Sequence, residues 1–254
     1  MIEKAPRKLE ARGLRVSRGG RVILRGVDLD ASAGEVVGVL GPSGAGKSTL
    51  FRALVGEELA DEGTVMLCGQ DVTHWPLWKR ARAGVGFIPQ GPSVLWELTV
   101  RQNLETFQAI AGQRPVHANL TYNAALRVGL EHRLDVRAGQ LSAGERRRLE
   151  FARAVTRPPT VLVCDEPFAG VDPAGAERLG NLLRALAEGG AIVILADHHV
   201  AEALRVCTNA ILLLDGEVAA AAPAGEFANL AIVRGRYLGT WSPGTSERAP
   251  EVND

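Results

Sequence analysis

The apolar residues of this chain gather in short continuous runs separated by longer polar segments. Runs of four to six residues occur at 36–40, 161–164, 191–196 and 210–214. Continuous rather than alternating hydrophobicity is typical of strands buried on both faces, as in a parallel sheet. The first three runs are followed by polar or glycine-containing turns and then by segments of helical periodicity. We therefore predict an α/β fold with a mostly parallel core sheet.

Helix signals follow several of these runs. Segment 47–55 repeats its large apolar residues at helical spacing. Asp172 followed by Pro173 is a strong helix start, because aspartate caps helices and proline suits the first turn. We expect that helix to end at the glycines 189–190.

Between residues 91 and 140 the pattern changes. No run typical of a buried strand occurs there, and segments 100–110 and 122–130 have helical periodicity. We therefore expect one domain over residues 10–240, with a helical subdomain at 91–145 inserted in it. The polar, proline-bearing segment 241–254 is expected to be a flexible C-terminal tail.

Composition narrows the class of protein. The chain has 29 Lys+Arg and 29 Asp+Glu, so it lacks the basic excess of a free-standing nucleic-acid binder, and we expect no nucleic-acid partner. Three widely separated cysteines argue against a disulfide framework or a zinc site. The first residues do not resemble a signal peptide, and no apolar run approaches the ~20 residues of a spanning helix. These features predict a cytoplasmic protein, which can still attach to a membrane protein.

The segment after the first apolar run carries the clearest chemical motif. Residues 41–49 match G-x-x-x-x-G-K-[ST] in the strand–loop–helix context that the motif requires, which disfavours the alternative of a chance glycine-rich turn. Glycines let backbone N–H groups point at phosphate oxygens, and the helix N-terminus adds partial positive charge. Lys47 can reach the β- and γ-phosphates, and Ser48 can bind Mg²⁺. The residues expected to bind the phosphates are Gly41, Pro42, Ser43, Gly44, Ala45, Gly46, Lys47, Ser48 and Thr49.

Two carboxylates end the buried run at 161–164. In a parallel sheet this strand end lies beside the phosphate loop. Asp165 is suited to hold Mg²⁺, and Glu166 is suited to polarise an attacking water. A pair of solvated carboxylates starting a loop is the alternative interpretation.

Residues 141–145, Leu-Ser-Ala-Gly-Glu, closely match the LSGGQ signature of ABC-transporter ATPases. With the phosphate loop before it and Asp165 and Glu166 after it, the chain resembles this family over about residues 10–240. The resemblance implies a P-loop NTPase cassette with an antiparallel β part. It also implies a head-to-tail dimer, either a homodimer or a pair of ABC subunits, with two ATP molecules between them. Ser142 and Gly144 of one subunit would then face the ATP held by the other, although Ser142 and Glu145 also form an ordinary helix capping box.

The resemblance assigns further roles residue by residue. Gln90 corresponds to the Q-loop glutamine that contacts Mg²⁺ and the attacking water, so the implied metal ligands are Ser48, Gln90 and Asp165. His198 corresponds to the switch histidine at the γ-phosphate, which makes Glu166, His198 and Gln90 the implied catalytic set. Asp172 corresponds to the D-loop at the dimer interface, and it is also a helix cap.

Two positions depart from the family pattern. Arg18 stands where the family has the aromatic residue that stacks on adenine; a guanidinium can stack on a base, so we keep it in the nucleotide site with an altered grip. Ala143 replaces the first signature glycine, and its methyl group lies where it could crowd the closed dimer.

Within the family, the chain most resembles the ATPases of lipopolysaccharide export, as residues 76–90, 144–150, 165–173 and 236–239 indicate. The alternatives are the ATPase of a branched-chain amino-acid importer and, in another class, a soluble ABC ATPase without a transport role. The resemblance places the protein on the cytoplasmic face of the inner membrane, with membrane subunits docking near residues 87–100. The docking candidates are Phe87, Val94, Leu95, Trp96, Leu98 and Val100, of which Leu98 and Val100 equally suit the protein core.

Overall fold

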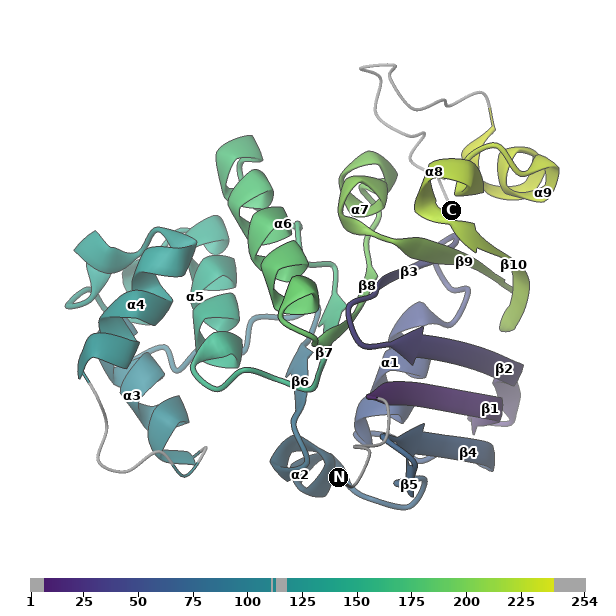
Figure 1. The fold of residues 1–254 in the computed structure, drawn as a ribbon, viewed down its shortest axis with the longest axis horizontal. Coiled ribbons are helices and arrows are strands. Elements are labelled where there is room, and N and C mark those ends of the chain that lie inside the picture. The colour runs from purple at the N-terminus through teal and green to yellow at the C-terminus, as the bar shows by residue number, and fades with distance from the viewer. Residues whose placement is uncertain (1–6, 111, 113–117, 240–254) are drawn as a thin grey trace, which may run out of the picture.

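The structure, a computed structural model, describes residues 7–110, 112 and 118–239; the predicted tail at 241–254 lies outside the described residues. Strands and helices alternate along much of the chain, and Figure 1 shows the helices α3, α4 and α5 gathered at one end and the strands at the other. The strands are β1 (Lys8–Arg18), β2 (Arg21–Ser32), β3 (Val36–Leu40), β4 (Glu62–Leu67), β5 (Gln70–Asp71), β6 (Val85–Ile88), β7 (Val161–Asp165), β8 (Ile192–Ala196), β9 (Asn209–Leu214) and β10 (Glu217–Pro223). The helices are α1 (Lys47–Val55), α2 (Leu77–Arg82), α3 (Val100–Ile110), α4 (Ala118–Val128), η1 (Glu131–Arg133), η2 (Ala138–Gln140), α5 (Ala143–Val155), α6 (Pro173–Glu188), α7 (Val200–Val206), α8 (Ala224–Phe227), α9 (Ala231–Val233) and η3 (Arg234–Leu238).

A mostly parallel sheet forms the centre. Within the described residues its strand order is β10-β9-β3-β8-β7-β6, and only the β9–β10 pair is antiparallel. Successive residues of a strand face opposite sides of the sheet. Val37 and Val39 therefore pack into one hydrophobic cluster, while Val36 and Leu40 pack into the other. Burial on both faces explains why the sequence shows continuous apolar runs, and the predicted core sheet is confirmed.

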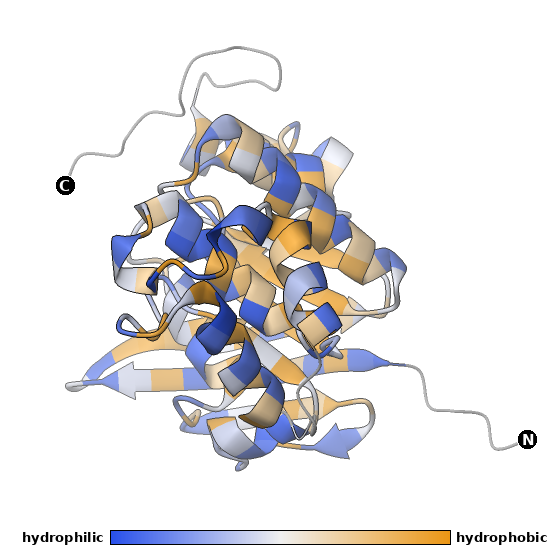
Figure 2. Cartoon of the chain, turned by 90° about the vertical axis from the view of Figure 1, so that its left-hand side faces the viewer, coloured by the Kyte–Doolittle hydropathy of each residue, from blue (hydrophilic) through white to orange (hydrophobic). Residues whose placement is uncertain are grey.

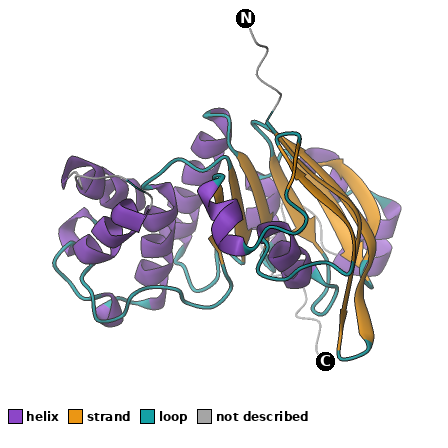
Figure 3. Cartoon of the chain, turned by 90° about the horizontal axis from the view of Figure 1, so that it is seen from below, coloured by secondary structure: helices purple, strands orange, loops and turns teal. Residues whose placement is uncertain are grey.

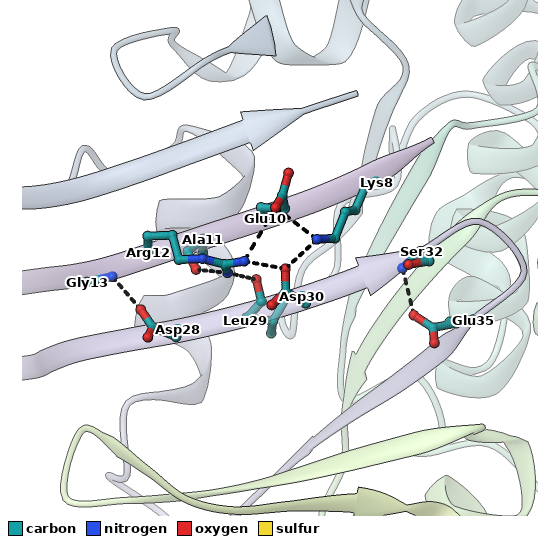
Figure 4. Close-up of polar contacts among 10 residues, drawn as sticks. All are labelled: Lys8, Glu10, Ala11, Arg12, Gly13, Asp28, Leu29, Asp30, Ser32 and Glu35. Atoms are coloured by element: carbon teal, nitrogen blue, oxygen red, sulfur yellow. Dashed lines mark hydrogen bonds and ion pairs between the residues drawn. The ribbon is translucent and has the colours of Figure 1, made fainter. Parts of the chain in front are cut away.

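The second sheet is antiparallel, with the order β2-β1-β4-β5 in the described part of the chain. Its inner face shares a core with α1 and one face of the parallel sheet. Its outer face carries ion pairs across the β1–β2 ladder: Lys8 Nζ lies 3.1 Å and Arg12 Nη2 lies 2.7 Å from Asp30 Oδ1 (Figure 4). The Arg12 guanidinium, more than Lys8, holds the pKa of Asp30 below its usual range.

Helices α3, α4 and α5 lie to one side of the parallel sheet, in the region where the sequence predicts a helical subdomain (Figure 3). Helix α3 has the predicted bounds, whereas the prediction of a helix at 122–130 is wrong at both ends, because α4 spans Ala118–Val128. Thr121 is fully buried and accepts a hydrogen bond from Gln108 (2.8 Å), a polar core contact that apolar periodicity does not reveal. Gly129 (φ 70°) ends the helix in a left-handed conformation.

Other predicted elements lie where the pattern placed them. Helix α1 has the predicted bounds, and Asp172 caps α6 with Pro173 in its first turn. In Figure 2 the strands behind the helices carry mostly hydrophobic colours, whereas the outer helices alternate between polar and apolar. Among the described residues, no helix is both long and apolar enough to cross a bilayer.

Candidate functional site

The phosphate loop joins β3 to α1 at the carboxyl edge of the parallel sheet. Gly46 has φ 105°, and a Cβ there would come within 2.9 Å of Leu24 Cδ2, so both the conformation and the space demand glycine. Lys47 is buried and folds back over the loop, donating to the carbonyl oxygens of Gly41 (2.7 Å) and Pro42 (2.9 Å). Burial is the main effect on Lys47 and lowers its pKa. An ammonium held in this way is ready to exchange carbonyl partners for phosphate oxygens.

A cleft of about 460 Å³ opens over this loop. It brings together segments that are far apart in the sequence: the start of β2, the phosphate loop, the ends of β6, β7 and β8, and the turn before β10. Its lining residues are Arg21, Val22, Ile23, Arg25, Ser43, Gly44, Gly46, Lys47, Ser48, Thr49, Gln90, Asp165, Glu166, His198 and Asp215.

Glu166 is the focus of polar contacts in the cleft. Its Oε1 atom lies 2.8 Å from Gln90 Nε2, which donates to it, and 2.8 Å from His198 Nε2. The three side chains come from loops that follow three neighbouring parallel strands, β6, β7 and β8. The structure thus assembles the three residues expected to be catalytic around one carboxylate oxygen.

Asp165 lies deeper than Glu166 and accepts a hydrogen bond from the Ser48 hydroxyl. Burial, its largest influence, raises the pKa of Asp165. The buried carboxylate, the Ser48 hydroxyl and the Gln90 amide form a set of oxygen donors that suits Mg²⁺, and the desolvated charge would gain from a bound cation. The donor chemistry therefore fits the metal that the motif implies.

The backbone at Glu166 is strained and is held from two sides. Its φ of 53° is uncommon for a non-glycine residue and is a feature that clusters at functional sites. Its N–H donates to the carbonyl oxygen of Ala196 at the end of β8 (2.7 Å). Its carbonyl oxygen accepts from the buried guanidinium of Arg147 (2.8 Å), which also donates to the carbonyl of Asp165. Arg147 is thus a support of the site that motif reasoning missed.

Arg147 belongs to a buried polar network that joins α5 to the segment after β6. It donates to the carbonyl oxygen of Pro89 (2.6 Å) and to Glu150 Oε2 (2.9 Å). Glu150 in turn accepts from the Ser93 hydroxyl (3.1 Å), and Arg153 donates to the Ser93 carbonyl (2.6 Å). Desolvation lowers the pKa of Arg153 to about 10. Gln90 therefore lies in a loop that α5 contacts on both sides, at Pro89 and at Ser93. The i,i+3 spacing of Arg147 and Glu150 does not single out this arginine, because Arg146 and Arg148 also have a glutamate at helical spacing.

Asp197 is a second support that sequence reasoning missed. Its buried carboxylate accepts from the backbone N–H of Phe168 (3.0 Å) and of His199 (2.8 Å) and contacts His199 Nδ1 at 2.8 Å. It ties the segment after Glu166 to the turn that presents His198. His199 contacts Asp197 and does not line the cleft.

Gly41, Pro42 and Ala45 of the phosphate loop do not line the cleft, and four predicted nucleotide-site residues beyond that loop also lie outside its lining. Ser142 caps α5 in a capping box with Glu145, and Asp172 caps α6, accepting from Gly175 N–H (3.4 Å). Gly144 is buried, and a Cβ there would come within 3.0 Å of the Gly170 carbonyl oxygen. The Arg18 guanidinium forms a bidentate pair with Glu58, with Nε 2.7 Å from Oε1. The role of each in nucleotide binding stays a prediction.

The predicted docking segment is only partly exposed. Val94 and Val100 are buried in the core cluster, so these two docking candidates cannot contact a partner directly. Phe87 and Leu98 are half-buried. Leu95 and Trp96 are exposed, and the Arg146 guanidinium lies 5.0 Å from the centre of the Trp96 ring. These two side chains are the apolar groups that the segment offers to a partner.

A phosphate loop beside clustered carboxylate, amide and imidazole side chains is the kind of site found in P-loop ATPases. The ABC transporter family model matches residues 24–169. The lipopolysaccharide export system ATP-binding protein LptB of Acidithiobacillus ferridurans is 39% identical over 232 residues, covering 91% of this chain and 96% of that protein. LptB of Escherichia coli K12 is 37% identical over 236 residues, covering 91% and 97%.

Solved structures of ABC-transporter cassettes have the same fold as this chain. The ADP conformation of MJ1267, an ATP-binding cassette of an ABC transporter, superposes with a TM-score of 0.81 at 26% identity, covering 92% of this chain and 99% of that one. A dimeric post-hydrolysis state of the cassette MJ0796 bound to ADP and Pi has a TM-score of 0.77 at 25% identity, covering 85% and 98%. This chain belongs to the ABC transporter family, as an ATP-binding subunit with ATPase activity.

Proposed function

We propose that this ATPase subunit binds ATP with Mg²⁺ in the cleft over the phosphate loop and hydrolyses it in a head-to-tail dimer to drive lipopolysaccharide export. The observation that carries the proposal is the convergence of Gln90 and His198 on the Glu166 carboxylate, beside the buried Lys47.

The phosphate loop and its helix bind the triphosphate. Backbone N–H groups of residues 43–49 and the N-terminus of α1 surround the β-phosphate, and Lys47 turns from the carbonyl oxygens of Gly41 and Pro42 toward the β- and γ-phosphates. Pro42 and Ala45 shape the loop from behind, because they do not line the cleft.

The other side chains of the cleft have separate roles in metal binding and in activation of the water. Ser48, Asp165 and Gln90 would hold Mg²⁺, which would neutralise phosphate charge. Glu166 orients and deprotonates the attacking water, a role worth roughly 10²–10⁴ in rate. His198 leaves Glu166 to contact the γ-phosphate, and Gln90 positions the water. The contacts of Gln90 and His198 with Glu166 would give way when nucleotide binds.

A second subunit completes the site. Ser142 and Gly144 are presented at the N-terminus of α5, where the helix dipole attracts anions, and they are outside the chain's own cleft. Ser142 is exposed at this helix end, where a head-to-tail partner could bring its ATP against it. Asp172 would lie at the same interface. Bound ATP then holds the two copies together, and its hydrolysis allows them to separate.

Membrane subunits would dock at Leu95 and Trp96, on the cytoplasmic face of the inner membrane. These exposed apolar side chains follow Gln90 by a few residues, so a helix bound there is mechanically joined to the cleft. Lipopolysaccharide is the proposed cargo because the curated relatives named above are export proteins for it and match the chain over 91% of its length.

Co-purification from detergent-solubilised membranes of the source cell tests the proposal. We expect the chain to bring down lipopolysaccharide-export membrane subunits, and Trp96→Ala to lose them while keeping ATP binding. Exposed Tyr122 on α4 provides a matched control, and Tyr122→Ala should keep the complex. Recovery of importer subunits would replace export with import, and ATP binding without any membrane partner would favour a soluble ABC ATPase.

A further inference from the structure

The described part of the chain ends in a wide helical turn, η3. Gly239 N–H donates to the carbonyl oxygen of Arg234 (2.8 Å), five residues back, which is the bond of a π-helix. Such turns are rare and often lie at functional sites. The Arg234 guanidinium donates to the carbonyl oxygen of Ala228 (3.1 Å) and to Asn229 Oδ1 (2.8 Å), the segment that follows α8. Helices α8 and α9 pack against β9 and β10 (Figure 1), so η3 is held beside the core sheet.

Two neighbouring residues of η3 reach the nucleotide site from outside the cleft. Arg236 Nη2 lies 3.9 Å from Asp215 Oδ2, and Asp215 lines the cleft. Tyr237 packs against a buried hydrophobic cluster, and its hydroxyl accepts a hydrogen bond from the backbone N–H of Gly41, the first residue of the phosphate loop. Tyr237 is not one of the residues that line the cleft. It therefore contacts the phosphate loop from behind, away from the space that a ligand would fill.

The environment of the Tyr237 hydroxyl keeps it uncharged. Burial raises the pKa of Tyr237 to about 12, and the nearby Asp197 carboxylate acts in the same direction. The contact with Gly41 is therefore a hydrogen bond between neutral groups at physiological pH. A bond of this kind is worth about a threefold to tenfold change in an equilibrium constant.

The start of the phosphate loop depends more on Tyr237 once phosphate is bound. Lys47 donates to the carbonyl oxygens of Gly41 (2.7 Å) and Pro42 (2.9 Å), and in the proposed function it leaves both for phosphate oxygens. Gly41 keeps its bond to Tyr237 and its packing against β9, where a Cβ on Gly41 would overlap the Leu213 carbonyl oxygen. The Tyr237 bond should therefore stabilise the phosphate-bound loop more than the free loop. A contact that favours the bound state in this way raises affinity.

We infer that Tyr237 is a positioning residue of the nucleotide site, whose hydroxyl holds the first peptide group of the phosphate loop in the conformation that binds the triphosphate. This inference rests on the proposed binding of ATP over that loop, and it adds to the site a residue from outside the cleft. Tyr237 has no contact with the substrate in this role. Its removal should therefore change the affinity for phosphate groups and leave the activation of water at Glu166 unaffected.

Tyr237→Phe removes the hydroxyl and keeps the ring, so it isolates the contact with Gly41. Calorimetric titration with the β,γ-imido analogue of ATP should give a dissociation constant about threefold to tenfold higher than that of the wild type. The KM for ATP should rise by a similar factor while kcat stays within about twofold, because the side chains around Glu166 are unchanged. Inorganic tripolyphosphate should lose affinity by the same factor as the analogue, because the loop binds phosphates and not the base.

Leu238→Val is the matched control, because Leu238 is the next residue of η3 and is buried in the core. It should lower the melting temperature about as much as Tyr237→Phe does, yet leave the dissociation constant of the analogue within about twofold of the wild type. Unchanged affinity in Tyr237→Phe, or an equal loss of affinity in both variants, would overturn the inference and leave the ATP site in place. Failure of the wild type to bind the analogue, or equal binding by Lys47→Ala, would instead overturn the nucleotide site and the inference with it.

Discussion

At the scale of single residues, Glu166 combines a strained backbone with a carboxylate that two donors share. Gln90 and His198 both contact Glu166 Oε1 at 2.8 Å. A glutamine side chain has the same shape and keeps one oxygen, so these contacts should largely remain. Glu166→Gln therefore preserves the shape of the cleft and removes the base. We expect steady-state ATP turnover to fall at least about 100-fold while ATP binding is retained. Turnover of the variant at the wild-type rate would remove Glu166 from its assigned role.

Asp165 and Lys47 are buried side chains whose charges are partly desolvated. Burial raises the pKa of Asp165, so the folded chain holds a proton there more tightly than the unfolded chain does. Protonation consequently stabilises the fold below the ordinary aspartate pKa of about 4, and that contribution is lost as pH rises through the raised pKa. At neutral pH the charged carboxylate destabilises the nucleotide-free protein.

Asp165→Asn should therefore raise the melting temperature of the nucleotide-free protein at pH 7 by roughly 2–4 °C for each 1 kcal/mol gained. The difference from wild type should shrink as pH is lowered toward 4, because both side chains are then neutral. Asp71 is a control for which the expected change in stability has the opposite sign, because hydrogen bonds from Thr73 lower its pKa. Asp71→Asn should lower stability at pH 7, and that difference should also fade as pH falls. Thermal scans from pH 8 down to about pH 3 measure both trends, and the Asp71 trend is expected only below about pH 4. A pH-independent effect of Asp165→Asn would contradict the linkage.

At the scale of elements, α5 holds together the loops that carry the chemistry. Arg147 and Glu150 are almost fully buried and 2.9 Å apart, so removal of one leaves the other as an uncompensated charge. Arg147→Met should cost about 3–5 kcal/mol of unfolding free energy. The double variant Arg147→Met/Glu150→Met should cost clearly less than the sum of the single changes, with a coupling of at least about 0.5 kcal/mol.

Urea unfolding of the two single variants and the double variant measures this coupling. The exposed pair Arg101–Asp135, at 3.0 Å, is the matched control, and its coupling should be at most about 1 kcal/mol. Additive costs at Arg147 and Glu150 would show that the two residues do not stabilise each other.

The same helix shows where sequence reasoning reaches its limit. Strands 36–40 and 161–165 could be predicted almost to the residue, because burial on both faces leaves a continuous apolar run. The convergence of Gln90, Glu166 and His198 could be predicted from motif order, since parallel strands bring their carboxyl ends to one edge. Arg147 could not, because arginine is normally exposed, and nothing local says which arginine of the run 146–148 turns inward. The Arg18–Glu58 pair joins residues 40 positions apart, a distance over which side-chain patterns carry no information.

At the scale of the whole molecule, the phosphate loop and the N-terminus of α5 are presented separately. The cleft contains Lys47, whereas Ser142 lies outside it, so one chain alone brings only half of the proposed site to a nucleotide. A head-to-tail pair of copies would combine the loop of each with the α5 end of the other. The structure of the related cassette MJ0796, described as dimeric and bound to ADP and Pi, has the same fold at a TM-score of 0.77.

Complementation between two inactive chains tests this pairing directly. Lys47→Ala removes the phosphate contact, and Ser142→Asp keeps a good helix cap while placing a carboxylate against the γ-phosphate. Each variant alone should lose ATPase activity. In an equal mixture about half of the dimers are mixed, and each mixed dimer joins the intact loop of one chain to the intact α5 end of the other. If the sites act independently, ATPase activity should return to about a quarter of the wild-type value. A mixture that stays inactive, although size-exclusion chromatography shows mixed dimers, would mean that each chain uses its own Ser142.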